Sequence, residues 1–312
     1  MMIVEGDAAD DEEHMMESLA TALSAGPVVL DGGLATELAA AGHDLSDHLW
    51  SARLLHDEPE AIVDAHLAFL RAGAQVVITA SYQATFEGMA RAGFDDDTTT
   101  VLLGRSVTLA RDACRRAADE GVDGPLWVAA SVGPYGAMLA DGSEYRGDYG
   151  LTVDELVRFH RRRMEVLAGA GADVLALETV PDVVEAEAML RVVAELGVPV
   201  WLSYTIDGDR TRAGQPVAEA FALAADVPEV IAVGVNCSAP ADVAGALAEV
   251  TGRPAVAYPN SGEVWDATAR AWTGDPGWGS VDPWLSAGAR LIGGCCRVTP
   301  AQISDLAAHL KA

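Results

Sequence analysis

Residues 170–178 read Ala-Gly-Ala-Asp-Val-Leu-Ala-Leu-Glu, and this stretch contains the pattern that decides the fold. A glycine of the kind that ends helices leads into a short apolar run, and the run closes on a carboxylate. Upstream, residues 153–168 carry apolar side chains at spacings of three and four, which predicts a helix. A helix that stops at glycine before a short buried strand is one unit of a parallel α/β sheet. The number of such units therefore determines the architecture.

Short apolar runs and longer helical patterns alternate along the whole chain. The expected strands are 28–31, 75–81, 126–132, 174–178, 200–206, 230–237, 255–258 and 290–293. The expected helices include 59–71, 98–120, 153–168, 183–196, 217–224, 241–250 and 300–310. Eight strands with interleaved helices predict a single-domain α/β fold, a (β/α)₈ TIM barrel. A doubly wound open sheet is the alternative, but residues 31–36 lack the Gly-x-Gly-x-x-Gly turn that usually follows its first strand.

The chain has 312 residues, and its 47 acidic and 20 basic side chains give a net charge of −27. We divide it into an acidic N-terminal tail, residues 1–25, with a short helix around 15–23, and a catalytic barrel, residues 26–312. The charge disfavours nucleic acid and membrane surfaces as partners and favours cationic small molecules. The sequence shows neither a long apolar span nor a basic leader, so we expect a cytoplasmic protein. The oligomeric state stays open.

Three of the four cysteines lie at the ends of expected strands: Cys237 in Gly-Val-Asn-Cys, and Cys295 with Cys296 in Gly-Gly-Cys-Cys. The carboxyl ends of barrel strands meet at one rim, so three thiolates can converge there on a zinc ion with an open fourth position. Neighbouring residues of a strand point to opposite faces. We therefore expect Gly293 and Gly294 to let the backbone leave β geometry, because glycine accepts dihedral angles closed to other residues.

The alternative for any cysteine is a small buried hydrophobe, and we keep this interpretation for Cys114 in an expected helix. Four cysteines in a chain of this length do not form a disulfide framework, and an intracellular location would keep them reduced.

Asp31 and Glu178 end two of the apolar runs. A carboxylate at the mouth of a barrel binds a cationic group, such as the ammonium of an amino acid, or forms a structural ion pair. Gly32 and Gly33 then let the backbone approach a ligand closely or turn sharply. The long loop 133–150 contains three tyrosines and several acidic residues. It is either a lid that suits a cationic ligand or an ordinary packed surface loop.

Three motifs now stand in order along the chain: Asp-Gly-Gly at 31–33, Gly-Val-Asn-Cys at 234–237 and Gly-Gly-Cys-Cys at 293–296. Together they resemble the homocysteine S-methyltransferase family, the zinc-dependent barrels that methylate homocysteine to methionine. The resemblance extends from about residue 28 to residue 310. Segments 142–149 and 258–263 are similar to the single-domain branch of that family that uses S-methylmethionine.

The resemblance implies one Zn²⁺ per chain, held by Cys237, Cys295 and Cys296. It implies methyl transfer from a sulfonium donor, S-methylmethionine or S-adenosylmethionine, to the thiol of L-homocysteine. The residues that we assign to substrate binding are Asp31, Gly32, Glu178, Asn236, Ser81 and Tyr135.

Two other functions fit the cysteines. A thiol redox enzyme would use Cys295 and Cys296 as a vicinal pair, and it predicts a stable disulfide without zinc. A non-catalytic zinc-binding barrel predicts bound metal but no methionine formed from homocysteine.

Overall fold

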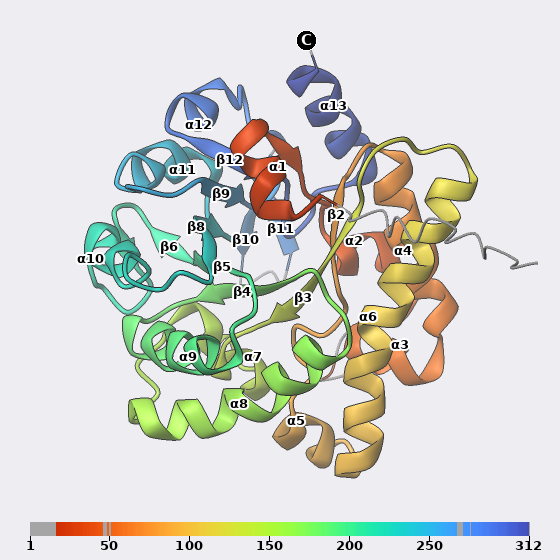
Figure 1. Cartoon of the computed structure of the whole chain (residues 1–312), viewed down its shortest axis with the longest axis vertical. Coiled ribbons are helices and arrows are strands. Elements are labelled where there is room, and N and C mark those ends of the chain that lie inside the picture. The colour runs from red at the N-terminus through yellow and green to blue at the C-terminus, as the bar shows by residue number, and fades with distance from the viewer. Residues whose placement is uncertain (1–16, 46–48, 50, 267–270, 275, 312) are drawn as a thin grey trace, which may run out of the picture.

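The computed structural model describes residues 17–45, 49, 51–266, 271–274 and 276–311. Eight parallel strands form one sheet in the order β1-β12-β9-β8-β5-β4-β3-β2. The two edges of this sheet meet, because Leu30 forms a parallel bridge with Val76 and the Val76 carbonyl accepts the Asp31 N–H at 3.0 Å. The sheet is therefore a closed barrel with helices around it (Figure 1). The predicted (β/α)₈ barrel is confirmed, and the open sheet was the wrong alternative.

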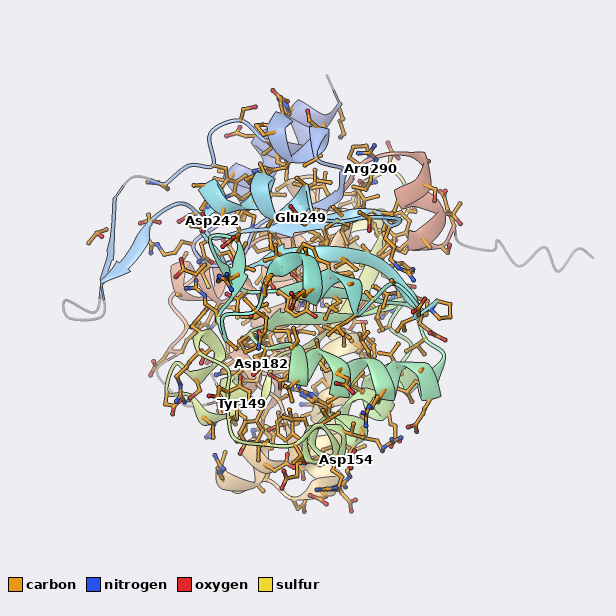
Figure 2. The ribbon with its side chains drawn as sticks, turned by 90° about the vertical axis from the view of Figure 1, so that its left-hand side faces the viewer. Tyr149, Asp154, Asp182, Asp242, Glu249 and Arg290 are labelled. Atoms are coloured by element: carbon orange, nitrogen blue, oxygen red, sulfur yellow. A yellow bond between two sulfur atoms is a disulfide. The ribbon has the colours of Figure 1, made fainter. Side chains whose placement is uncertain are left out.

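The strands of the barrel are β1 (Val28–Val29), β2 (Val76–Ile78), β3 (Trp127–Val132), β4 (Val174–Val180), β5 (Val200–Tyr204), β8 (Val230–Asn236), β9 (Ala255–Tyr258) and β12 (Ala289–Ile292). Two antiparallel hairpins add β6 (Ile206–Asp207) with β7 (Arg210–Thr211), and β10 (Val264–Asp266) with β11 (Ala271–Thr273). The β10–β11 hairpin extends away from the barrel in Figure 2. All eight predicted barrel strands are present, with ends that differ by a few residues.

The longer helices are α4 (Pro59–Arg71), α6 (Asp96–Asp119), α8 (Val153–Gly169), α9 (Val183–Leu196), α11 (Pro240–Leu247) and α13 (Pro300–Leu310). The shorter ones are α1 (Leu19–Ala25), α2 (Leu34–Ala40), α3 (Ser51–Asp57), α5 (Phe86–Arg91), α7 (Tyr135–Leu139), α10 (Val217–Ala222) and α12 (Asp282–Ser286). Helices α4, α9 and α13 have the predicted bounds. In the part of the chain that the structure describes, no helix combines the length and the apolar character needed to cross a membrane.

Helix α1 covers the end of the barrel at which the strands begin. Leu19 and Leu23 join the buried cluster that fills the barrel interior, together with Val28 and Trp127. The Trp127 Nε1–H donates to the Glu17 carbonyl at 2.9 Å. Residues 19–25, which the sequence assigns to the tail, thus pack against the barrel. The acidic stretch 7–13 lies outside the described residues. Because α1 covers this end, we expect the functional site at the other end of the barrel, where the strands end.

His66 in α4 is fully buried, and neither ring nitrogen has a hydrogen-bond partner among the described residues. Burial lowers the pKa of His66 from 6.5 to about 4. The folded protein therefore binds this proton less readily than the unfolded chain does. The contribution that neutral His66 makes to the stability of the folded protein is present above about pH 6.5 and is lost as the pH falls through about 4.

We expect the His66→Leu variant to lose less stability on acidification than the wild type. From pH 7 to pH 4, the free energy of unfolding of the wild type should fall by about 3 kcal/mol more than that of the variant. Urea unfolding at each pH measures this difference. Leu67→Ala in the same helix also changes a buried side chain but removes no titratable group, so it should keep the wild-type pH dependence over that range. A His66→Leu curve parallel to the wild-type curve would contradict the assignment.

Candidate active site at the carboxyl ends of the strands

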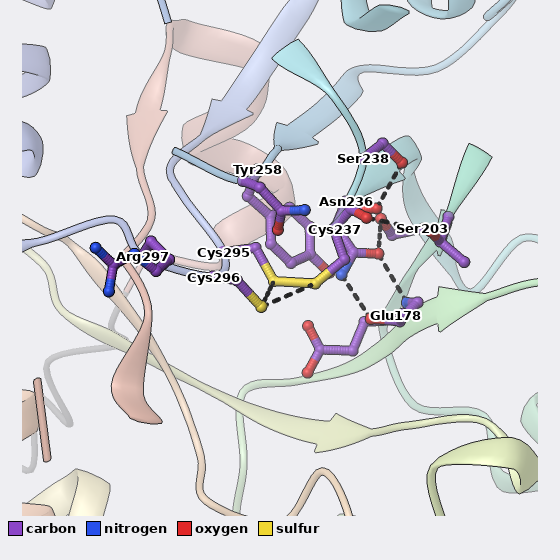
Figure 3. The surroundings of a disulfide bond; sticks show 12 residues. Glu178, Ser203, Asn236, Cys237, Ser238, Tyr258, Cys295, Cys296 and Arg297 are labelled. Atoms are coloured by element: carbon purple, nitrogen blue, oxygen red, sulfur yellow. Dashed lines mark hydrogen bonds between the residues drawn. A yellow bond between two sulfur atoms is a disulfide. The ribbon is translucent and has the colours of Figure 1, made fainter. Parts of the chain in front are cut away.

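Three cysteine sulfurs come together where β8 and β12 end (Figure 3). The Sγ of Cys296 lies 3.9 Å from that of Cys237 and 4.0 Å from that of Cys295. Cys237 and Cys295 are joined in a disulfide, and all three sulfurs lie within 4.8 Å of one another. The predicted convergence is confirmed. The expectation that the cysteines are reduced was wrong, because Cys237 and Cys295 converge and form a disulfide. This disulfide is not the vicinal pair, Cys295 with Cys296, that the redox alternative would use.

A turn after β12 lets two neighbouring cysteines face the same point. The Val298 N–H donates to the Cys295 carbonyl at 3.2 Å and closes this turn. Its third residue, Arg297, has a φ of 67°, and the Arg297 N–H donates to Thr36 Oγ1 at 2.9 Å. A positive φ at this position reverses the chain direction, as in type II turns. Both cysteines therefore lie in a turn beyond β12, which ends at Ile292, so the alternation of strand faces does not apply to them.

The two glycines before these cysteines serve a different purpose from the predicted one. Neither Gly293 nor Gly294 has a positive φ. A Cβ at Gly293 would lie 2.6 Å from the Asp31 carbonyl, and a Cβ at Gly294 would overlap the Val298 side chain. Glycine is required at these positions because the Leu30–Asp31 segment packs closely on Gly293 and the Val298 side chain on Gly294, whereas the left-handed conformation falls on Arg297. The prediction that their dihedral freedom redirects the chain was wrong.

The donor set fits zinc. Zinc–sulfur bonds of about 2.3 Å in a tetrahedron place the sulfurs about 3.8 Å apart. The distances of 3.9 and 4.0 Å from Cys296 to its two neighbours agree with this spacing. Burial raises the pKa of the Cys296 thiol to about 11, so a cation at this point would be needed to hold it as a thiolate. Reduction of the disulfide would provide the other two thiolates.

Two carboxylates lie beside the cysteines. Glu178, near the disulfide in Figure 3, is buried and accepts a hydrogen bond from Ser131 Oγ. Burial raises the pKa of Glu178 to about 7, against the hydrogen bonds from Ser131 and Tyr258. Asp31 Oδ2 accepts the Ile78 N–H at 2.8 Å. Its pKa is raised well above the ordinary value, mainly by burial and further by Glu178.

Among the residues that the structure describes, these carboxylates do not form structural ion pairs. Asp31 Oδ1 has no hydrogen-bond partner, and within the described ranges neither Asp31 nor Glu178 makes a salt bridge. Two neighbouring buried carboxylates without a cationic partner are unfavourable unless a ligand neutralises them. The geometry therefore favours a cationic ligand group over the structural alternative.

Asn236 connects the strand that carries Glu178 to the strand that precedes Cys237. Its Oδ1 accepts the Thr179 N–H at 2.7 Å and the Ser203 hydroxyl at 2.8 Å, and its Nδ2 donates to Thr179 Oγ1 at 2.8 Å. Thr179 has a φ of 57° and Cys237 a φ of 46°, conformations that side chains such as threonine rarely adopt. The fully buried Asn236 therefore holds two strained strand ends in place.

A pocket with a cavity volume of about 140 Å³, partly open to solvent, lies over the three sulfurs. Its polar lining includes Thr36, Tyr82, Glu144, Tyr145, Glu178 and Tyr258, and Gly32 contributes backbone. None of the described lining residues is Lys, Arg or His. The pocket is thus suited to cationic ligands.

Some predicted substrate residues lie outside this pocket. Ser81 is buried and donates to the Ser131 carbonyl at 2.7 Å, and the ring of Tyr135 packs against Tyr149 and Phe159 at centroid distances of 5.2 and 4.9 Å. Asp31 and Asn236 also lie behind the pocket wall rather than in its lining.

The sequence assignments omitted Tyr82, Glu144, Tyr145 and Tyr258, all of which line the pocket. The composition of loop 133–150 indicated acidic and aromatic contacts, and Glu144 and Tyr145 belong to that loop. Composition does not show which of its side chains face inward.

Comparison with known proteins agrees with this geometry. A family model described as homocysteine S-methyltransferase matches residues 28–310. Homocysteine S-methyltransferase 4 of Zea mays is 47% identical over 307 residues, covering 92% of this chain and 90% of that protein. Homocysteine S-methyltransferase of Escherichia coli (strain K12) is 48% identical over 294 residues, covering 90% of this chain and 94% of that protein.

A crystal structure of the Escherichia coli homocysteine methyltransferase MmuM in its metallated form matches with a TM-score of 0.82. Its sequence is 45% identical, and the match covers 91% of this chain and 96% of that one. Fold, cysteine cluster and sequence agree along nearly the whole chain. The chain belongs to the homocysteine S-methyltransferase family.

Proposed function

We propose that this chain transfers a methyl group from a sulfonium donor, S-methylmethionine or S-adenosylmethionine, to the thiol of L-homocysteine, which gives methionine. The observation that carries this proposal is the group of three cysteine sulfurs within 4.8 Å of one another at a pocket with acidic walls. Relatives named homocysteine S-methyltransferase, at 47% and 48% identity, support it. The catalytic unit of the proposal is residues 26–312, and its partners are small molecules.

We propose further that Cys237, Cys295 and Cys296 hold one Zn²⁺. Zinc bound there would lower the pKa of the substrate thiol and favour its thiolate form at neutral pH. The metallated form of the Escherichia coli enzyme, at a TM-score of 0.82, supports a metal in this family. Only the reduced protein has three thiolates, so the disulfide between Cys237 and Cys295 has to be reduced before metal can bind.

The pocket residues would position two substrates for an in-line displacement. The homocysteine thiolate attacks the methyl carbon, the new carbon–sulfur bond forms, and the old bond breaks with its electron pair left on the donor sulfur. The leaving thioether is neutral, so this step needs no general acid. Alignment of the reacting atoms can contribute roughly 7 to 11 kcal/mol.

Glu178 lines the pocket, and Asp31 lies behind it. We propose that Glu178 binds the ammonium group of homocysteine, with the Gly32 backbone beside it, and that Asp31 contributes negative charge from behind the wall. Asn236 would act as a positioning residue through Thr179. Ser81 and Tyr135 would support the strand ends without contacting substrate, since neither lines the pocket.

The test is methionine formation from homocysteine by the reduced, zinc-loaded chain, with each sulfonium donor in turn. We expect product with at least one donor, loss of activity with a chelator, and recovery when zinc is added back. Bound zinc without product from any donor would instead support a non-catalytic barrel. A stable disulfide protein that binds no zinc after reduction would support the redox alternative.

A further inference from the structure

Glu144 is a buried carboxylate in the pocket wall that the proposed displacement leaves without a role. Its side chain is only 5% exposed, and Oε2 has no hydrogen-bond partner among the residues that the structure describes. Arg146, two positions later, donates to Ser143 Oγ at 2.9 Å instead. A buried, unpaired carboxylate is costly for the folded protein unless a ligand compensates it.

The local chain holds Glu144 in a defined position. It lies in a 3₁₀ helix, Ser143–Tyr145, preceded by Gly142 with a φ of 83°. Asp141 Oδ1 accepts the Ser143 N–H at 3.0 Å. A Cβ at Gly136 would overlap the Glu144 backbone nitrogen, so this segment packs directly on α7. The carboxylate is therefore part of a fixed wall.

The surroundings of Glu144 are aromatic and mainly negative, and one cation, the Arg212 guanidinium, lies 5.9 Å from the centroid of the Tyr145 ring. Tyr82 and Tyr145 line the same pocket, and the charge of Glu144 acts on both hydroxyls and on the thiol of Cys296. Burial raises the pKa of Glu144, and Asp141 raises it further. A carboxylate that shares a pocket with two tyrosines and with a cysteine that would hold the nucleophile is complementary to a cation at the reacting end of the second substrate.

We propose that Glu144, with the rings of Tyr82 and Tyr145, forms the subsite that binds the sulfonium centre of the methyl donor. This inference rests on the proposed methyl transfer. The donor carries a positive charge on sulfur, whereas the thioether produced from it carries none. Glu144 would therefore bind the donor more tightly than the thioether product. This difference would promote replacement of the product by a new donor molecule after the reaction. Because the charge disappears as the methyl group moves, its attraction is strongest before the transition state, and its loss should appear in KM more than in kcat.

The test is Glu144→Gln in the reduced, zinc-loaded enzyme. We expect the donor KM to rise about tenfold or more, with kcat and the homocysteine KM within about threefold of the wild type. Binding of S-methylmethionine relative to methionine, measured without homocysteine, isolates the sulfonium charge. The preference of the wild type for S-methylmethionine should fall about tenfold in the variant.

Asp148→Asn is the matched control, because it removes one exposed charge from the same loop at a position with a φ of 48°, which asparagine accepts. It should leave both KM values and the binding ratio unchanged. Glu144→Asp keeps the charge and should retain most of the preference, which separates charge from folding if Glu144→Gln is unstable.

An unchanged binding ratio in Glu144→Gln would overturn the proposal. Equal weakening of S-methylmethionine and methionine would also overturn it, because Glu144 would then recognise their common ammonium group. The binding ratio does not depend on turnover. The wild type could instead show no methyl transfer but still prefer S-methylmethionine over methionine, with the preference lost in Glu144→Gln. That result would refute the proposed function and leave the sulfonium subsite standing.

Discussion

Replacement of Cys296 by alanine should abolish both zinc retention and methyl transfer. Its sulfur lies 3.9 and 4.0 Å from the other two, so the substitution leaves only two of three protein thiolates. Two thiolates do not make the three-ligand site that keeps one position open for chemistry. We expect bound zinc to fall from about one per chain to a small fraction, and methionine formation to fall by more than about a hundredfold.

The measurement is metal content and methionine formation in protein kept under reductant, because Cys237 and Cys295 can pair when they are oxidised. Cys114→Ala is the matched control. Cys114 is buried in α6 and does not line the pocket, so its removal should leave zinc content and turnover at wild-type values. Full zinc and full activity in Cys296→Ala would rule out the three-cysteine site.

The success of the fold prediction followed from a repeated local signal. Helices α4, α9 and α13 span 11 to 14 residues, long enough for the apolar spacing to identify them. Helices α3, α5, α7 and α12 have five to seven residues. A stretch this short contains fewer than two full turns, so its periodicity is a weak signal. Of the helices with five to seven residues, α10 (Val217–Ala222) was predicted within 217–224.

The site was predictable to the extent that it depends on strand ends. Cys237 and Cys295 are 58 positions apart, and once eight strands were counted the barrel geometry brought them together. The inward position of Glu144 depends on the contact between its backbone and Gly136, which no local pattern records. Gly294 shows the same limit, because a sequence shows that a glycine is present but not whether conformation or space requires it.

Replacement of Glu178 should weaken homocysteine binding specifically. Its carboxylate is buried and lines the pocket, with no salt-bridge partner within the described part of the chain. A lost charge-assisted hydrogen bond costs about 1.5 to 3 kcal/mol. We therefore expect Glu178→Ala to raise the KM for homocysteine tenfold or more. Initial rates at varied homocysteine and saturating donor measure this change.

Glu178→Gln separates charge from packing, since an amide can keep a hydrogen bond with Ser131 Oγ but not the attraction to an ammonium group. It should raise the homocysteine KM nearly as much as alanine does. Glu187→Gln on the outer face of α9, where Glu187 pairs with Arg191 at 2.6 Å, should leave this KM unchanged. An unchanged homocysteine KM in both Glu178 variants would remove this residue from the substrate site.

Variants of the two pocket carboxylates should then raise the KM of different substrates. Glu178 variants should shift the homocysteine KM, and Glu144 variants should shift the donor KM, because each substrate brings its charge to a different wall. If the assignments are independent, the double variant Glu178→Gln/Glu144→Gln should show both shifts with additive free energies. Strong coupling would mean that both carboxylates contact the same cation, and the division of the pocket into two subsites would be incorrect.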